Sequence, residues 1–167
     1  MRRSRKHWGY KAAAALLCCL ALPGRAELPA PSLCQPGEAI VFACSVAGKL
    51  VSLCRAADAA NLSALQYRYG TPGAVELDYP APGQRARAAF GTRKEALIGG
   101  GIAAVVFVRS GYTYTVYSRV SRADGVTPAF EDGVTVERRG KLLQHLRCDD
   151  GGAGFVGMSS AASRSEK

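Results

Sequence analysis

The chain has 167 residues, of which 22 are Lys or Arg and 13 are Asp or Glu, giving a formal net charge of +9. Six basic residues but no acidic ones precede residue 27, so the remainder carries 16 basic against 13 acidic residues, a net charge of +3. So small an excess gives no reason to expect nucleic acid or an acidic membrane as a partner of that remainder.

Residues 1–26 have the order of a secretory signal peptide. Basic residues dominate Met1–Lys11, an unbroken apolar run follows over Ala12–Leu22, and Gly24-Arg25-Ala26 places small residues where a signal peptidase reads. The apolar run is shorter than the roughly 20 residues that a membrane-spanning helix needs. We therefore predict cleavage between Ala26 and Glu27, a periplasmic or secreted product, and no membrane span after processing.

Four cysteines remain after this cleavage: Cys34, Cys44, Cys54 and Cys148. An even number in an exported chain predicts two disulfides, for which three pairings exist. The cysteines lie too far apart for the closely spaced pairs of a zinc site, and His145 is the only histidine after the signal peptide. We therefore predict no metal site and no cofactor.

Short runs of alternating or continuous apolar residues, separated by Gly and Pro turns, follow an extended lead-in at 27–36. They predict strands at 38–46, 49–54, 65–69, 74–79, more weakly 84–90, then 102–108, 112–120, 133–137 and 141–147. This pattern predicts one all-β domain over residues 27–150, a twisted antiparallel meander or small up-and-down barrel of eight or nine short strands, braced by disulfides. The Gly- and Ser-rich residues 151–167 are predicted to be a disordered tail.

The Ala47-Gly48 turn predicts the register of the first hairpin and, with it, the disulfide pairing. A two-residue turn places Cys44 opposite Val51 and Cys54 opposite Val41, so the two cysteines lie on opposite faces and cannot bond. If there are nine strands, the last runs parallel to the first and ends near Cys44. This arrangement favours Cys44–Cys148 and Cys34–Cys54.

Several short motifs recur along this domain. An F-x-C strand ends at Cys44, a V-S-L-C strand at Cys54 and a Y-R-Y-G strand at Gly70, and a G-V-x-V…G-K…C ending closes at Cys148. The set resembles an uncharacterised family of small exported bacterial proteins with an F-x-C hairpin, a V-S-L-C strand and a Y-R-F/Y-G strand. The resemblance implies a bacterial origin, export and disulfides, and it implies no activity.

Candidate catalytic groups are few. A Ser-His-Asp or Cys-His site would have to use His145, which lies in an alternating strand and is interpreted as an ordinary strand residue. Two carboxylate pairs, Glu76 with Asp78 and Asp149 with Asp150, could serve a hydrolase acting on envelope polymers, but such pairs are usually solvated. The triplet at 99–101 opens a strand rather than a helix, so we interpret it as a flexible connection and not as a phosphate loop.

A possible binding face consists of residues of the types that anchor protein interfaces, Tyr67, Arg68, Tyr69, Tyr112 and Tyr114. The alternative is that these tyrosines pack in the core. We predict a non-enzymatic binding module, such as an inhibitor or an immunity-type protein, with a protein partner in the cell envelope. The alternatives are an envelope-polymer hydrolase using a carboxylate pair and a structural envelope component, which dispersal of the tyrosines in the core would favour.

Overall fold

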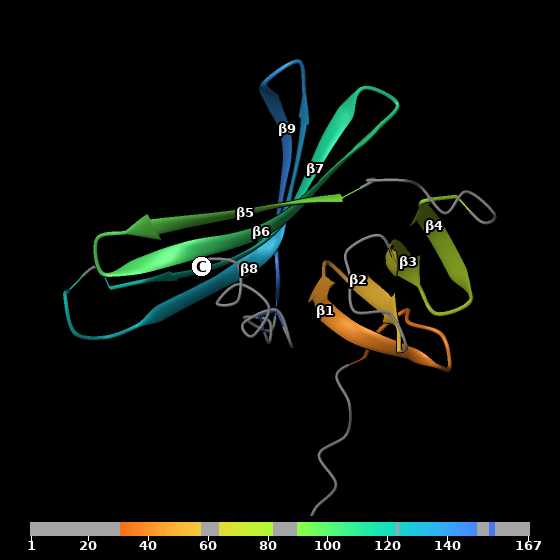
Figure 1. The fold of residues 1–167 in the computed structure, drawn as a ribbon, viewed down its shortest axis with the longest axis horizontal. Helices are drawn as coiled ribbons and strands as arrows, with labels where there is room; N and C mark the ends of the chain where they lie inside the picture. The colour runs from red at the N-terminus through yellow and green to blue at the C-terminus, as the bar shows by residue number, and fades with distance from the viewer. Residues whose placement is uncertain (1–30, 58–63, 82–89, 123, 150–153, 156–167) are drawn as a thin grey trace, which may run out of the picture.

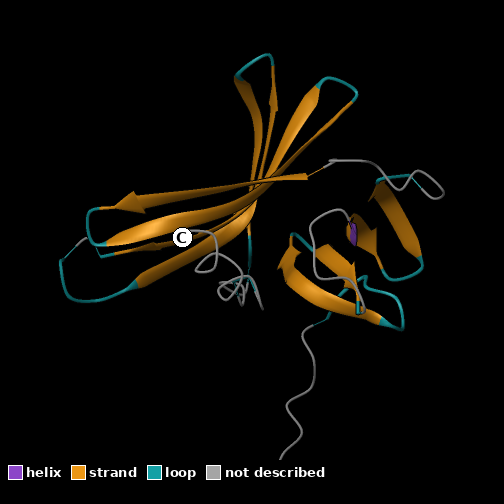
Figure 2. Ribbon diagram, viewed as in Figure 1, coloured by secondary structure: helices purple, strands orange, loops and turns teal. Residues whose placement is uncertain are grey.

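The computed structural model describes residues 31–57, 64–81, 90–122, 124–149 and 154–155. Strands and the loops between them make up almost all of these residues (Figure 2), which confirms the all-β prediction. Within the described residues, no helix is long and apolar enough to cross a membrane. The predicted signal peptide with its cleavage site at Ala26–Glu27, and residues 156–167 of the predicted tail, lie outside this description.

In the part of the chain that the structure describes, nine strands form two antiparallel sheets in which every neighbouring pair is consecutive in the chain (Figure 1). The N-terminal sheet comprises β1 (Glu38–Val46), β2 (Lys49–Ala56), β3 (Leu65–Thr71) and β4 (Ala74–Tyr79). The C-terminal sheet comprises β5 (Phe90–Leu97), β6 (Gly100–Arg109), β7 (Tyr112–Ser121), β8 (Ala129–Arg138) and β9 (Lys141–Arg147). The predicted meander of nine strands is therefore present, divided into two sheets rather than closed into one barrel.

Three hairpins turn on a residue pair in which both members have positive φ. These pairs are Ala47-Gly48 (48° and 78°), Ser110-Gly111 (53° and 76°) and Arg139-Gly140 (51° and 75°). Such turns match the right-handed twist of the flanking strands. In the first hairpin Cys44 pairs with Val51, as predicted.

The predicted pairing of Cys54 with Val41 is wrong. Cys54 lies opposite Ile40, because a bulge between Ile40 and Phe42 inserts one residue into β1. Turn chemistry fixes the register next to the turn, whereas a bulge farther along the strand shifts it.

The fifth strand also differs from the prediction. It begins at Phe90 and continues to Leu97, whereas residues 84–89 of the predicted strand lie outside the described residues. β5 is an edge strand whose interior is exposed to solvent, so it lacks the apolar pattern of a half-buried strand. The triplet at 99–101 is no flexible connection: a Cβ on Gly100 would stand 2.0 Å from the Val120 carbonyl oxygen, so only glycine allows this close strand packing.

Aromatic rings join the two sheets. The ring of Phe107 lies 4.9 Å from that of Tyr67, 4.6 Å from that of Tyr79 and 4.8 Å from that of Tyr114, and Phe90 packs against the same ring at 5.4 Å. Tyr67 and Tyr79 belong to the N-terminal sheet and the other three to the C-terminal sheet. The core of the domain therefore lies between the sheets.

Disulfides pair Cys34 with Cys54 and Cys44 with Cys148, the pairing that the strand order favours. Beside the second disulfide, the Asp149 amide donates to the Ser45 carbonyl at 2.8 Å, and the Asp149 carboxylate accepts from the Ala47 amide at 2.7 Å. These contacts fasten the end of β9 to the first hairpin.

Two residues of the predicted disordered tail are packed against the domain. The Phe155 ring lies 5.2 Å from that of Phe42, and the Gly154 amide donates to the buried Asp132 carboxylate at 2.6 Å. The prediction of disorder is wrong for these two residues. Ring packing of Phe155 and the buried Asp132 carboxylate hold them against the domain, although the sequence composition there is that of a tail.

Candidate binding surface

The structure does not assemble the predicted tyrosine face. Tyr67 is 2% exposed and packs between the sheets, while Tyr69, Tyr112 and Tyr114 are partly buried against the same core. Arg68 is 6% exposed and points to the opposite side of β3 from Tyr67. Tyr67 therefore lies within the core and Arg68 on the other side of β3, so the five residues do not share one open face.

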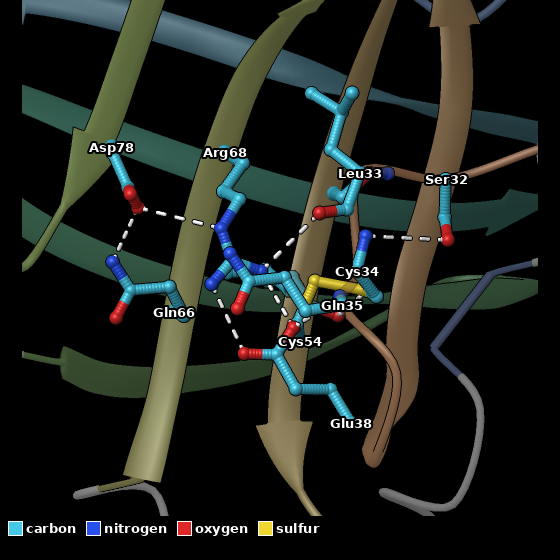
Figure 3. Close-up of a disulfide and its surroundings, with 11 residues drawn as sticks. Ser32, Leu33, Cys34, Gln35, Glu38, Cys54, Gln66, Arg68 and Asp78 are labelled. Atoms are coloured by element: carbon cyan, nitrogen blue, oxygen red, sulfur yellow. Dashed lines mark hydrogen bonds and ion pairs between the residues drawn. A yellow bond between two sulfur atoms is a disulfide. The ribbon is translucent and has the colours of Figure 1, made fainter. Parts of the chain in front are cut away.

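Arg68 instead holds the N-terminal lead-in against the sheet (Figure 3). Its guanidinium donates to both carboxylate oxygens of Glu38, at 2.6 and 3.0 Å, and to the Leu33 carbonyl at 3.3 Å. The Leu33 amide donates to the buried Ser52 hydroxyl at 2.9 Å, and the Cys34–Cys54 disulfide lies alongside. Leu33 and Cys34 are therefore held against the outer side of the N-terminal sheet.

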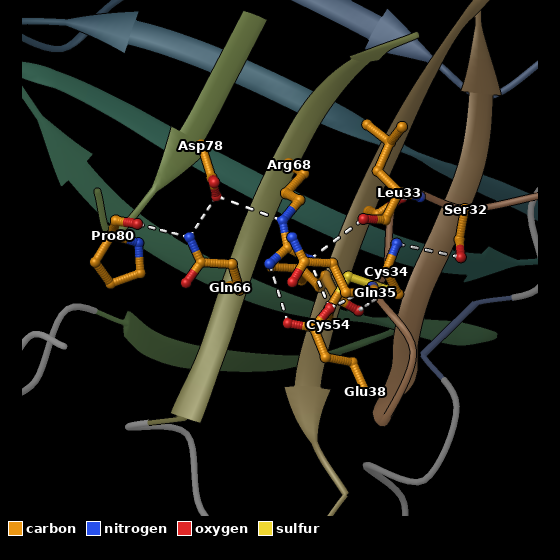
Figure 4. Close-up of polar contacts among 12 residues, drawn as sticks. Ser32, Leu33, Cys34, Gln35, Glu38, Cys54, Gln66, Arg68, Asp78 and Pro80 are labelled. Atoms are coloured by element: carbon orange, nitrogen blue, oxygen red, sulfur yellow. Dashed lines mark hydrogen bonds and ion pairs between the residues drawn. A yellow bond between two sulfur atoms is a disulfide. The ribbon is translucent and has the colours of Figure 1, made fainter. Parts of the chain in front are cut away.

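Acidic groups around Arg68 are engaged in the same arrangement (Figure 4). Arg68 Nε lies 3.6 Å from Asp78 Oδ1, and the Gln66 amide donates to Asp78 and, at 2.6 Å, to the Pro80 carbonyl. Burial, the largest single influence, would raise the pKa of Glu38, but the hydrogen bonds from Arg68 and the Gln35 amide together with the Arg68 charge outweigh it and lower that pKa.

The predicted carboxylate pairs do not converge on a cleft. Glu76 forms an exposed ion pair with Lys49 at 2.8 Å, Asp78 faces Arg68, and Asp149 caps the first hairpin. Asp150 lies outside the described residues. Each described member of the two pairs has a structural partner.

One grouping has the composition of a metal site. Ligand atoms of Cys34, Cys54 and Glu38 lie within 4.8 Å of one another. Both sulfurs are bonded to each other in the disulfide, and Glu38 already accepts from Arg68, so the group offers no thiolate to an ion.

A polar cluster that the sequence did not indicate lies on the outer face of the C-terminal sheet, the face turned away from the core. We call it the Tyr117 cluster; it contains Tyr117, Glu131, His145 and Arg147. The Tyr117 hydroxyl lies 2.9 Å from Glu131 Oε1 and 2.7 Å from His145 Nε2. Arg147 Nε lies 3.3 Å from Glu131 Oε2. Three neighbouring strands contribute these residues, so one network spans β7, β8 and β9.

Glycine at position 133 makes this network possible. Tyr117 pairs with Gly133, which in turn pairs with Arg147 across the sheet. A Cβ at Gly133 would stand 2.8 Å from the Tyr117 hydroxyl and 2.4 Å from the Leu146 carbonyl oxygen. The missing side chain lets the Tyr117 ring lie across β8 and reach β9.

The hydrogen-bond pattern defines the donors of the cluster. Tyr117 is 7% exposed, and burial, followed by the hydrogen bond to Glu131, raises its pKa well above the usual value. The hydroxyl therefore keeps its proton and donates it to Glu131, so His145 Nε2 must be the donor to Tyr117. Because the His145 Nε2–H is taken up by Tyr117, Arg147 is the donor that the cluster presents at the sheet surface, with a side-chain exposure of 66%, beside the His145 ring at 34%.

Sequence reasoning missed this cluster because Glu131 lies beyond a loop of unknown geometry and looked like a solvated acid. The available signal was Gly133, an isolated glycine inside an alternating strand, which indicates close approach by a neighbour. His145 was correctly interpreted as a strand residue, but its partners depend on a register that no short turn defines.

Comparison with protein-family models, curated proteins and solved structures finds no match to this chain.

Proposed function

We propose that this protein is an exported, non-enzymatic binding module that recognises an acidic segment of a protein partner through the outer face of its C-terminal sheet. The observation that carries the proposal is the Tyr117 cluster, in which Glu131 and Tyr117 hold His145 and Arg147 at an open surface. Donors that are fixed before binding lose little conformational freedom when they bind.

The edge of the sheet supports the same reading. β9 is exposed over most of its length, and its second half contains His145 and Arg147, whereas the whole strand has no acidic residue. An edge strand offers unpaired backbone groups beside this basic row. Charge complementarity therefore favours a carboxylate-rich partner lying along β9.

Export is supported by the signal-peptide pattern of residues 1–26 and by the two disulfides, which suit an oxidising compartment. The burial of the predicted tyrosine face removes the first argument for binding and is what a structural envelope component would show. The Tyr117 cluster is the main support for the proposal, so the proposal fails if that cluster binds nothing.

The test is crosslinking in the native cell envelope with the processed, oxidised protein, followed by affinity measurement with the purified partner. We expect Arg147→Ala to weaken binding about 30-fold, the loss typical of an interface anchor. Lys49→Ala, which removes an exposed cation from the N-terminal sheet, should change affinity less than twofold. Equal affinity for wild type and Arg147→Ala, or turnover of envelope glycan or peptide without a partner, would contradict the proposal.

A further inference from the structure

Two hairpin tips of the C-terminal sheet form an end of the molecule that the proposed function does not use. β5 begins opposite Phe107, so the tips of the β6–β7 and β8–β9 hairpins extend beyond it (Figure 1). The register places Arg109 opposite Tyr112, Tyr112 opposite Arg138, and Arg138 opposite Lys141. Both turns therefore lie side by side at the same end.

This end concentrates positive charge. Four cations, which we call the basic tips, gather there: Arg109, Arg138, Arg139 and Lys141. All but Arg109 are exposed, and among the residues that the structure describes none of the four forms an ion pair with a carboxylate. The basic tips hold four of the 16 cations that follow residue 26, so the small net charge of the chain conceals a strongly basic end.

Exposed apolar side chains lie next to the basic tips along the strands. Val108 is 57% exposed, Leu142 51% and Leu143 48%. One row of paired residues crosses strands β6 to β9 in the order Val108, Thr113, Glu137 and Leu142, so Val108 and Leu142 stand at its two ends. These aliphatic side chains border the hairpin turns and are open to contact with an apolar surface.

A partly buried aromatic ring lies on the other face of the sheet at the same end. The Arg138 guanidinium lies 5.0 Å over the ring of Tyr112 and is 3.4 Å from its hydroxyl. Tyrosine and arginine with aliphatic neighbours are typical of the boundary between headgroups and acyl chains, where the charged ends remain in water.

We propose that the basic tips dock this protein on an anionic phospholipid surface, with the cations at the headgroups and Val108, Leu142 and Leu143 in the interface. Apolar groups at the ends of two projecting hairpins fit a lipid surface better than a soluble acidic chain, which would be bound by the cations alone. This proposal goes beyond the protein partner inferred for the outer face and uses different residues.

The test measures co-sedimentation of the processed, oxidised protein with two kinds of vesicle, one of phosphatidylcholine alone and one of equal parts phosphatidylcholine and phosphatidylglycerol. We expect binding to the anionic vesicles only. Each cation near such a surface contributes about a fivefold gain in affinity, so combining Arg138→Gln, Arg139→Gln and Lys141→Gln should weaken binding about 100-fold. A matched triple variant, Lys49→Gln with Arg93→Gln and Lys94→Gln, removes the same charge elsewhere and should bind within about twofold of wild type.

A second variant separates insertion from attraction. Leu142→Trp places the only tryptophan in the processed chain at the proposed interface, because Trp8 lies in the predicted signal peptide. We expect its emission to shift to shorter wavelength on anionic vesicles and to remain shifted at high salt. An unshifted spectrum, an equal loss in the two triple variants, or binding of soluble polyphosphate but not vesicles would overturn the proposal. Arg147→Ala should leave vesicle binding unchanged, so failure of this proposal is distinct from failure of the proposed function.

Discussion

Arg68 is a buried cation for which the fold supplies anionic and carbonyl partners on two sides. Glu38 accepts two of its hydrogen bonds, and the Leu33 carbonyl accepts a third. A buried charge that loses its partner is costly, so this arrangement stabilises the lead-in only while Glu38 is ionised. The consequence is a dependence of stability on pH.

We expect Glu38→Gln to lower the free energy of unfolding by about 2 kcal/mol at neutral pH, because charged hydrogen bonds to Arg68 are lost. The pKa of Glu38 is lowered from 4.5 by folding, so its contribution is complete above pH 4.5 and disappears as pH falls through the folded pKa. Urea unfolding from pH 7 down to pH 3 should show the two proteins converging below pH 4.5. A constant difference across that range would contradict the assignment.

Gly133 offers a second test on a single residue. We expect Gly133→Ala to destabilise the domain by about 2–3 kcal/mol, because the new Cβ meets the Leu146 carbonyl and displaces Tyr117. Gly91→Ala is the matched control, since the nearest atom to its Cβ lies 4.0 Å away. Thermal unfolding of the two variants should differ clearly; equal melting temperatures would mean that β8 moves to accommodate the methyl group.

The Tyr117 cluster could not be predicted from the sequence beyond the signal of Gly133, for a physical reason. Alternation assigns each residue to a face, but it does not say which residues of distant strands lie opposite each other. Tyr117 and His145 meet because β8 intervenes in a register determined by the long β7–β8 connection and by a bulge between Val136 and Glu137. The predicted tyrosine face did not form for a related reason. Alternation correctly placed Tyr67 and Tyr69 on one face of β3, but it does not indicate which face the other sheet covers.

At the scale of elements, the meander was largely predictable. Most strands could be predicted from apolar runs that end at the turns Ala47-Gly48, Ser110-Gly111 and Arg139-Gly140, because each of these turns joins two consecutive strands that pair with each other. Strand β5 was misplaced because an exposed edge strand has no apolar face to detect. The division into two sheets was not predictable, since nothing in the strand sequences indicates that β4 and β5, although consecutive, do not pair.

The aromatic contact between sheets should dominate their association. We expect Phe107→Ala to cost about 3–5 kcal/mol, because Phe107 is 2% exposed and contacts rings from both sheets. Phe130→Ala removes the same atoms from a residue that is 67% exposed and should change stability by less than about 0.5 kcal/mol. Urea unfolding followed by tyrosine circular dichroism would measure both. Similar losses would show that the sheets do not depend on this contact.

At the scale of the whole molecule, the two disulfides constrain very different lengths of chain. Cys34 and Cys54 are 20 residues apart, and Cys44 and Cys148 are 104 apart. A disulfide lowers the conformational entropy of the unfolded chain, and more so for a longer loop. Replacing both cysteines by alanine should therefore lower the free energy of unfolding by about 3 kcal/mol for the first pair and about 4.5 kcal/mol for the second. Denaturant unfolding of the two double variants tests this order, and a larger loss from the short loop would contradict it.

The contacts between Asp149 and the first hairpin have a further consequence. Cys148 belongs to the last described segments of the chain, so its bond to Cys44 forms only when synthesis has passed through both sheets. A chain ending before residue 148 leaves Cys44 with a free sulfhydryl and the first hairpin without its Asp149 cap. A chain truncated before residue 148 therefore differs chemically from a longer one by one reactive thiol. A thiol-specific reagent, or a cellular quality-control system that recognises free thiols, can detect this difference.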